Sequence, residues 1–259
     1  VLAGALDDEA NRDKYAAFAE GYKVYFDPST RFMRGLDSEG NWRTPFNPRA
    51  SNHRNDDYCE GTAWQWTWFV PHDVDGLVEL MGGRDAFIGK LDSLFTADSK
   101  LEGESTSVDI SGLIGQYAHG NEPSHHIAHL YNYVGQPWRT QEIVDEVLHT
   151  LYFNNPDGLS GNEDCGQMSA WYILNAMGFY QVCPGKPVYS IGRPLFNEAT
   201  VHLKDGKSFK VIAHNNSRDN KYVRSIVLNG NKLETPFFTH QDIVDGGTLE
   251  LTMGSEPLK

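Results

Sequence analysis

The spacing of hydrophobic residues changes along this chain, from a helical period to an alternating one, near Pro184-Gly185. Before that point, apolar residues recur at the three- and four-residue spacing of an amphipathic helix. Start and stop signals accompany some of these windows, such as Thr140 before one and Gly82-Gly83 after another. The windows that predict helices are 14–26, 73–81, 85–95, 125–134, 140–153 and 166–179.

After residue 186 the apolar residues fall in short alternating runs, separated by turn signals such as Asn229-Gly230. The pattern therefore predicts a mainly α fold, with a helical region over 1–185 and a small antiparallel β region over 186–259. Helix pairs that follow one another in this way would suit part of a helical toroid. The runs that predict strands are 199–203, 208–214, 222–230 and 248–253.

The composition narrows the kinds of partner that the protein could bind. A hydrophobic content of 39% over 259 residues is that of a globular protein with a sizeable core. The formal net charge of -13 argues against nucleic acid, which is a polyanion and favours basic surfaces. Acidic groups gathered in a cleft would instead suit a cation or a neutral polar substrate.

The sequence contains no signal for a membrane span. No apolar run approaches the roughly 20 residues that cross a bilayer. The opening, VLAGALDDEANRDKY, lacks an initiator Met and a signal-peptide pattern, and it is typical of a helix entered part-way. We therefore expect a piece of a longer protein. Its three cysteines, Cys59, Cys165 and Cys183, allow one disulfide at most and have no zinc-binding spacing.

The first segment with candidate catalytic or binding residues is YCEGTAWQWTWFVPHD, residues 58–73. Three tryptophans alternate in it, from Trp64 to Trp68, and flat aromatic faces stack on sugars while amides such as Gln65 bond their hydroxyls. Glu60 beside them would serve as a general acid if an apolar wall favoured its protonated form. The alternative is that the tryptophans are core residues and Glu60 is a surface acid.

His72 and Asp73 end the same segment. A polar pair next to an aromatic platform is a candidate contact for sugar hydroxyls. The carboxylate of Asp73 also fits the N-cap of the helix predicted at 73–81, and that role would explain half of the pair.

The second segment is QYAHGNEPSHH, residues 116–126. Asn121 and Glu122 offer hard oxygen ligands, and Gly120 lets its carbonyl approach a cation closely. Such donors favour calcium over zinc. His119 in the same loop is a candidate substrate contact. The simpler role for Glu122 is to complement the dipole of the following helix.

His125 and His129 suggest a third reading, a zinc hydrolase. They stand four residues apart, so a helix would place both on one face, where they could bind zinc. The zinc-protease motif, however, requires Glu directly after the first His, and His126 stands there. The sequence therefore disfavours zinc.

The third segment is GNEDCGQMSAW, residues 161–171, which leads into a predicted helix. Asp164 is placed to cap that helix by accepting backbone N–H bonds. A carboxylate at a helix start is also fixed in direction and ionised, which suits the activation of a water. Glu163 is expected to point away or to bond a neighbour, and Asn162 precedes both acids.

Together the three segments resemble glycoside hydrolase family 92, the calcium-dependent exo-α-mannosidases. The resemblance rests on their order and spacing and covers essentially the whole chain. The quoted motifs are EGTAWQWTWFVPHD, HGNEPSHH with YNYVGQPW, and GNEDCGQMSAWYILNAMGFY, with FDPSTRFMRG and WRTPFNP upstream.

The resemblance implies hydrolysis of terminal α-mannosides, often α-1,2-linked, with inversion at the anomeric carbon. By position, Glu60 matches the general acid of the family and Asp164 its general base. Gly120, Asn121 and Glu122 match the segment that holds calcium. The candidate substrate contacts are Trp64, Gln65, His72, Asp73, His119 and Asn162. Many members carry Asp where this chain has Asn162, so Asp164 would work without a second carboxylate.

The resemblance also implies an (α/α)6-type helical toroid that normally follows an N-terminal β-sandwich domain. The predicted helices are too few to close such a ring, so the 259-residue chain alone is expected to have little activity. Because enzymes that degrade glycans usually meet them outside the cytoplasm, we expect a periplasmic or secreted protein. The alternative function is a non-catalytic carbohydrate-binding module built on the tryptophans and the β region.

Overall fold

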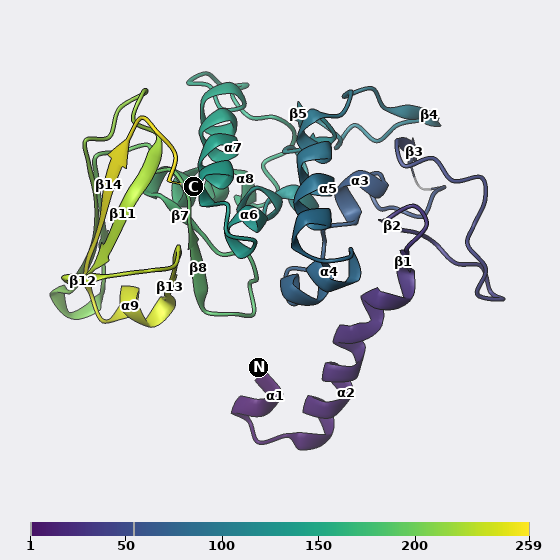
Figure 1. The fold of residues 1–259 in the computed structure, drawn as a ribbon, viewed down its shortest axis with the longest axis horizontal. Helices are drawn as coiled ribbons and strands as arrows, with labels where there is room; N and C mark the ends of the chain where they lie inside the picture. Colours follow the sequence, from purple (N-terminus) through teal and green to yellow (C-terminus); the bar gives the residue numbers. More distant parts are fainter. Residues whose placement is uncertain (1, 54, 259) are drawn as a thin grey trace. The chain divides into compact units, whose positions relative to one another are not determined.

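The computed structural model describes residues 2–53 and 55–258, and the chain divides into two compact units after Ser124 (Figure 1). Helices make up the larger share of the regular structure, but strands occur in both units. The prediction that strands are confined to the region after 186 was therefore incomplete. The regions 1–185 and 186–259, taken as domains, stay a prediction.

The first unit contains short helices joined by long connections. Two predicted windows are confirmed, as α4 (Val74–Leu80) and α5 (Arg84–Thr96). The remaining helical elements are α1 (Leu2–Ala5), α2 (Glu9–Ala19), the 3-10 helix η1 (Glu20–Tyr25), α3 (Ala63–Trp66) and the 3-10 helix η2 (Glu122–Ser124).

The opening of the chain is not one continuous helix. Asp8 caps α2 by accepting a hydrogen bond from the backbone N–H of Asn11 at 3.1 Å. The window predicted at 14–26 starts within α2, because the Asp8 cap sets the helix start earlier in the chain. It then runs through η1 to Phe26, where a strand begins.

Six very short strands form three pairs in the first unit. These pairs are β1 (Phe26–Asp27) with β2 (Phe32–Met33), β3 (Ala50–Asn52) with β4 (Glu102–Ser105), and β5 (Leu113–Ile114) with β6 (Tyr117–Ala118). Strands this short show no alternation in sequence, which is why periodicity missed them. The unit packs around fully buried side chains: Trp68, Leu77, Phe87, Leu91, Leu94 and Tyr117.

In the second unit two of the predicted helices are confirmed, as α7 (Pro137–Thr150) and α8 (Gln167–Met177). The helix predicted at 125–134 was wrong as a single element. That stretch forms the 3-10 helix η3 (Ile127–His129) followed by the four-residue α6 (Leu130–Tyr133). Buried bonds from His129 to residues far along the chain outweigh the local helical pattern there.

All four predicted strands are confirmed, as β9 (Glu198–His202), β10 (Ser208–His214), β11 (Tyr222–Leu228) and β14 (Gly247–Gly254). With β12 (Asn231–Lys232) they form one sheet in the order β12-β11-β14-β10-β9. A second sheet has the order β13-β8-β7, from β13 (Phe237–Thr239), β8 (Val188–Ile191) and β7 (Phe179–Tyr180).

The larger sheet is mixed, and the prediction of a purely antiparallel region was wrong. Strands β10 and β14 pair in parallel, with Phe209 opposite Gly247. A tight hairpin would force antiparallel pairing, but β11 to β13 and α9 (His240–Val244) separate these two strands in the chain. Alternate residues of β10 are buried in the core of this unit: Phe209, Val211 and Ala213.

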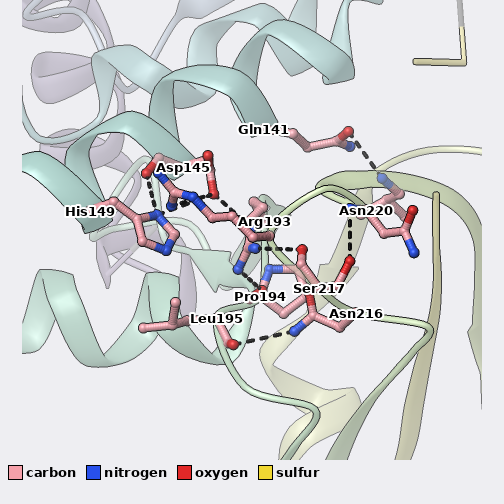
Figure 2. Close-up of polar contacts among 11 residues, drawn as sticks. Gln141, Asp145, His149, Arg193, Pro194, Leu195, Asn216, Ser217 and Asn220 are labelled. Carbon is pink, nitrogen blue, oxygen red and sulfur yellow. Dashed lines mark hydrogen bonds and ion pairs between the residues drawn. The ribbon is translucent and has the colours of Figure 1, made fainter. Parts of the chain in front are cut away.

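Helix α7 packs on the β strands of the same unit through buried polar contacts. Figure 2 shows Asp145 of α7 between His149 and Arg193, with Arg193 Nε 2.9 Å from the Asp145 carboxylate. The backbone N–H of Val223 donates to Gln141 at 3.1 Å. A buried ion pair of this kind is destabilising to break, because one charge is then left unpaired.

Candidate functional site

Glu60 lies in the loop that leads into α3, and its backbone has a φ of 51°. Residues other than glycine rarely adopt this left-handed conformation, and functional sites are one of the places where it is kept. Two side chains hold the loop. Asn121 Nδ2 donates to the Glu60 carbonyl at 2.8 Å, and Trp66 Nε1 donates to the Cys59 carbonyl at 2.8 Å. The structure thus brings Glu60 together with Asn121 of the predicted cation segment.

The carboxylate of Glu60 is exposed and makes no hydrogen bond or ion pair with another described residue. The apolar wall expected around it is not formed within the first unit. Its fixed backbone and unpaired side chain leave it available to a ligand.

The three tryptophans near Glu60 have different environments. Trp68 is fully buried, 5.3 Å from the ring of Phe87, so for this residue the core reading is confirmed. Trp66 is half-buried and packs edge-on against Phe69. Trp64 is half-buried, and its Nε1 has no hydrogen-bond partner among the described residues.

Lys90 beside Trp64 was missed by sequence reasoning. Its Nζ lies 3.2 Å from the ring centre of Phe32 and 4.5 Å from that of Trp64. Burial, with a smaller contribution from the charge of Arg31, lowers the pKa of Lys90 to about 7. Its place on the buried face of α5 gave no sequence signal, because a helical lysine is ordinarily a solvated residue.

The side-chain amide of Gln65, predicted to contact a sugar, is instead hydrogen-bonded within the protein. Gln65 Oε1 accepts hydrogen bonds from the backbone N–H and the hydroxyl of Thr62, and Nε2 donates to the Gln116 carbonyl. These bonds form a capping box at the start of α3. The amide therefore fixes the segment after Glu60, which argues against a contact with substrate.

His72 and Asp73 likewise have structural partners. Asp73 caps α4 through the backbone N–H of Gly76 at 3.0 Å and accepts from Tyr22 Oη at 2.8 Å. Burial opposes ionisation of Asp73, but these hydrogen bonds outweigh it and lower its pKa. His72 Nε2 lies 2.9 Å from the Ala19 carbonyl. The capping alternative is thus confirmed for Asp73.

The loop predicted to bind calcium contains a chemically suitable but incomplete set of donors. Asn121 Oδ1 accepts from the Glu122 backbone N–H at 3.1 Å and keeps a second lone pair. Glu122 adds a half-buried carboxylate and Gly120 a carbonyl. These hard oxygens fit calcium, which takes six to eight, so other ligands must complete the set. His119 in this loop is buried, with Nδ1 2.7 Å from Tyr117 Oη.

At the start of α8, Glu163 bonds a neighbour, as one of its two alternatives had it, and it is the side chain of this acid, not that of Asp164, that bonds the helix. Glu163 accepts from the Ser169 backbone N–H and hydroxyl, both at 3.0 Å, whereas the N-cap position itself is Gly166, with no side-chain bond. The prediction that Asp164 caps this helix was therefore wrong. The reason is a left-handed turn through Asp164 and Cys165, with φ of 50° and 55°, after which Gly166 and not Asp164 occupies the N-cap position.

The Asp164 carboxylate is consequently exposed, and it makes no hydrogen bond or ion pair with another described residue. Asn162 before it is also exposed. Asp164 thus shares with Glu60 a left-handed backbone and an unpaired carboxylate.

The two histidines considered as zinc ligands, His125 and His129, are hydrogen-bonded within the protein. His129 is fully buried, with Nδ1 3.0 Å from Ser190 Oγ and Nε2 2.9 Å from Asn175 Oδ1. Burial lowers the pKa of His129 to about 4, so the ring is neutral. His125 Nδ1 lies 3.1 Å from Gln167 Nε2. Neither ring nitrogen of His129 is left for a metal. The three cysteines form no disulfide in the part of the chain that the structure describes: Cys59, Cys165 and Cys183.

Comparison with known proteins identifies relatives of the whole chain. The model of the glycosyl hydrolase family 92 catalytic domain matches residues 1–255. A family GH92 alpha-mannosidase from Bacteroides thetaiotaomicron, solved with mannoimidazole, is 42% identical, with a TM-score of 0.92 over 99% of this chain and 34% of that one. A family GH92 inverting mannosidase from the same organism is 41% identical, with a TM-score of 0.85 over 98% of this chain and 35% of that one.

A curated relative from Arthroderma benhamiae, described as an uncharacterized secreted glycosidase, is 32% identical over 200 residues. The match covers 76% of this chain and 24% of that protein. The chain therefore spans about a third of the length of the solved relatives and about a quarter of the curated one. In the part of the chain that the structure describes, no helix has the length and apolar character needed to cross a bilayer.

Proposed function

Because the chain belongs to glycosyl hydrolase family 92, we propose that the protein carrying it removes terminal α-linked mannose, chiefly α-1,2-linked, from glycans with inversion at the anomeric carbon. The substrate class is supported by the solved relatives, one described as an alpha-mannosidase and the other as an inverting mannosidase. Inversion is supported by the description of one of them as an inverting mannosidase. The linkage is proposed from the resemblance of the motifs alone.

One observation supports the proposed catalytic pair most directly. Glu60 and Asp164 are both exposed carboxylates on left-handed backbone, and neither is paired with a described residue. The carboxylates of Asp73 and Glu163, by contrast, are bonded within the fold. Glu60 and Asp164 are thus the two acids of the motif segments that are open to a substrate, and the left-handed backbone of both is compatible with a functional position.

In the proposed reaction Glu60 donates a proton to the glycosidic oxygen as the bond to the anomeric carbon breaks. Asp164 accepts a proton from the water that attacks this carbon from the opposite face. Inverting enzymes hold the two carboxyl groups roughly 6.5–9.5 Å apart to admit that water. With Asn162 in place of the Asp of many members, Asp164 is proposed to act without a second carboxylate.

Gly120, Asn121 and Glu122 are proposed to hold calcium together with ligands from elsewhere. Bound calcium would supply positive charge and a fixed template for sugar hydroxyls near the reacting carbon. The bond from Asn121 to the Glu60 carbonyl supports this placement, because it joins the cation segment to the loop of the acid. Of the other candidate contacts, Trp64 and Asn162 are kept. Gln65, His72 and Asp73 are already bonded within the fold, and His119 is fully buried against Tyr117.

The remaining parts of the proposal concern the whole protein. We propose that the helices of this chain form part of an (α/α)6-type toroid. Further polypeptide, like that which the solved relatives have outside the matched region, would complete the ring. An N-terminal β-sandwich domain would belong to the same protein. The secreted curated relative supports a location outside the cytoplasm, either periplasmic or secreted.

Replacing Glu60 tests this function. In the full-length protein, Glu60→Gln should lower kcat on α-1,2-mannobiose by about 10²–10⁴-fold, because the proton donor is lost. Hydrolysis of α-mannosyl fluoride should fall far less, since fluoride leaves without protonation. Glu104→Gln is the matched control, because Glu104 is also an exposed carboxylate. A Glu60→Gln protein that turned over mannobiose at the unchanged rate would exclude Glu60 as the acid.

A further inference from the structure

Helix α8 has a row of polar contacts along one of its faces. Gln167, Trp171 and Asn175 follow one another at four-residue spacing, so they lie on the same side of the helix. Trp171 Nε1 donates to the His125 carbonyl at 2.9 Å, and Asn175 Oδ1 lies 2.9 Å from His129 Nε2. This row holds α8 to the segment from His125 to His129.

Gln167 is the first residue of α8, and its side chain has two partners. Gln167 Nε2 lies 3.1 Å from His125 Nδ1 and donates to Tyr180 Oη at 3.3 Å. Both partners are buried, and the ring of Tyr180 stacks on that of His129 with 5.5 Å between the ring centres. Because side chains in a packed interior have little freedom to move, the amide of Gln167 anchors the first turn of α8.

The same residue holds the turn that carries Asp164. The Gln167 backbone N–H donates to the Asp164 carbonyl at 3.1 Å. Asp164, Cys165 and Gly166 have φ of 50°, 55° and 91°, and non-glycine residues keep such a conformation only where their surroundings enforce it. The Asp164 side chain is bonded to no described residue, so the backbone of this turn alone determines where the carboxylate is carried.

We propose that Gln167 is a positioning residue for the base of the reaction. Its amide, bonded to His125 and Tyr180, holds the first turn of α8, and the N–H of this turn holds the backbone of Asp164. The inference rests on the proposed function, in which Asp164 accepts a proton from the attacking water. Gln167 acts on the rate only through Asp164, since misplacing a reacting group by about 1 Å can cost roughly 10²-fold.

An isosteric variant of the full-length protein tests this role. Gln167→Met keeps the length of the side chain but removes its bonds to His125 and Tyr180. On α-1,2-mannobiose, kcat should fall by about 10–100-fold, because Asp164 is no longer held where it accepts the proton of the water. KM should stay within about twofold, since the loss concerns the transition state alone. Hydrolysis of α-mannosyl fluoride should fall by the same factor, because water attacks in both reactions.

A double-mutant cycle separates this role from a purely structural one. Asp164→Asn removes the base, so adding Gln167→Met to it should lower the remaining rate by less than about twofold. A residue that only stabilised the fold would lower the rate by the same factor in both backgrounds. The matched control is Gln181→Met, which removes another half-buried glutamine of this unit, bonded to the Lys186 carbonyl at 2.8 Å, and should leave kcat unchanged.

Three results would overturn the positioning role of Gln167 alone. These are an equal loss from Gln167→Met in the wild-type and Asp164→Asn proteins, an unchanged kcat in Gln167→Met, and a loss confined to KM. If Asp164→Asn by itself turned over mannobiose at the wild-type rate, the proposed base would fall, and this inference with it. The failure of the inference and the failure of the proposed function are therefore distinguishable.

Discussion

At the residue scale, the geometry of Glu60 and Asp164 is the basis of the proposed chemistry. Each is a non-glycine residue with φ near 50°, a conformation that costs on the order of 1–3 kcal/mol. The surroundings maintain it: Asn121 and Trp66 hold the loop of Glu60, and the Asp164 carbonyl accepts from the Gln167 N–H at 3.1 Å. The backbone that carries each carboxylate is consequently held in place, while the carboxylate itself is bonded to no described residue.

The different environments of Asp164 and Glu163 predict different effects of mutation on turnover and on stability. Asp164→Asn should lower kcat by about 10²–10⁴-fold, because the base is lost. It should change the free energy of unfolding by less than about 0.5 kcal/mol, since the Asp164 side chain is bonded to no described residue and Asn tolerates left-handed backbone. Glu163→Ala should do the reverse, costing about 1 kcal/mol of stability through the lost bonds to Ser169.

Urea unfolding and mannobiose turnover of the two variants provide the measurements. A loss of stability in Asp164→Asn equal to that in Glu163→Ala would show that Asp164 serves the fold. Retention of turnover in Asp164→Asn would remove it from the reaction.

These same acids show what sequence could and could not predict at this scale. The motifs correctly pointed to Glu60 and Asn121 as parts of one neighbourhood. The cap at α8 was assigned to the acid nearest the helix, but the chain turns through left-handed residues there, so Glu163 reaches the helix instead. Spacing alone does not reveal such a turn. The capping box of Thr62 and Gln65, by contrast, is readable in T-A-W-Q.

At the element scale, the length of a helix or strand determined whether the sequence pattern predicted it correctly. The helices α5, α7 and α8 and the strands β10, β11 and β14 are long enough to show their period, and all were predicted. Two-residue strands show none. The stretch 125–134 has a helical pattern, yet it forms η3 and α6 because His129 bonds to Ser190 and Asn175. Those partners lie far along the chain, beyond the reach of any local window.

The buried histidine gives a pH prediction for the second unit. Burial lowers the pKa of His129 from 6.5 to about 4, so the unfolded chain binds this proton at a higher pH than the folded one. Protonation therefore favours unfolding. The free energy of unfolding should fall by up to roughly 3 kcal/mol from this group as pH decreases from 6.5 to about 4.

Chemical denaturation of the chain at pH 7 and at pH 5 measures this dependence. His129→Gln should flatten it by removing the titrating group, whatever its effect on stability at pH 7. His240→Gln, at an exposed position, should leave the dependence as it is. If the free energy of unfolding depended on pH in the same way in the wild-type and His129→Gln chains, the buried imidazole of His129 could not be the titrating group.

At the scale of the whole molecule, the chain is a family 92 segment that covers 34% of a solved relative. Its own oxygens from Gly120 to Glu122 are fewer than calcium requires, so the cation site is expected to be complete only with additional protein, substrate or water. For the same reason we expect the 259-residue chain alone to turn over mannobiose far more slowly than the full-length protein.

Calcium dependence follows from this proposal. Chelation should abolish most of the activity of the full-length protein, and calcium, but not zinc, should restore it, because the donors are hard oxygens. Glu122→Gln should weaken calcium binding by about tenfold or more, measured by calorimetry, since one charged ligand is lost. Activity that survived thorough chelation unchanged would remove the metal from the account.

The stereochemistry of the product is the sharpest test of the pairing of Glu60 with Asp164, because only an acid and a base on opposite faces of the sugar invert the anomeric carbon. Proton NMR of full-length protein acting on α-1,2-mannobiose would follow the first mannose released before it mutarotates. With Glu60 as acid and Asp164 as base, the initial product should be β-mannose. Initial release of α-mannose, or no release of mannose, would contradict it.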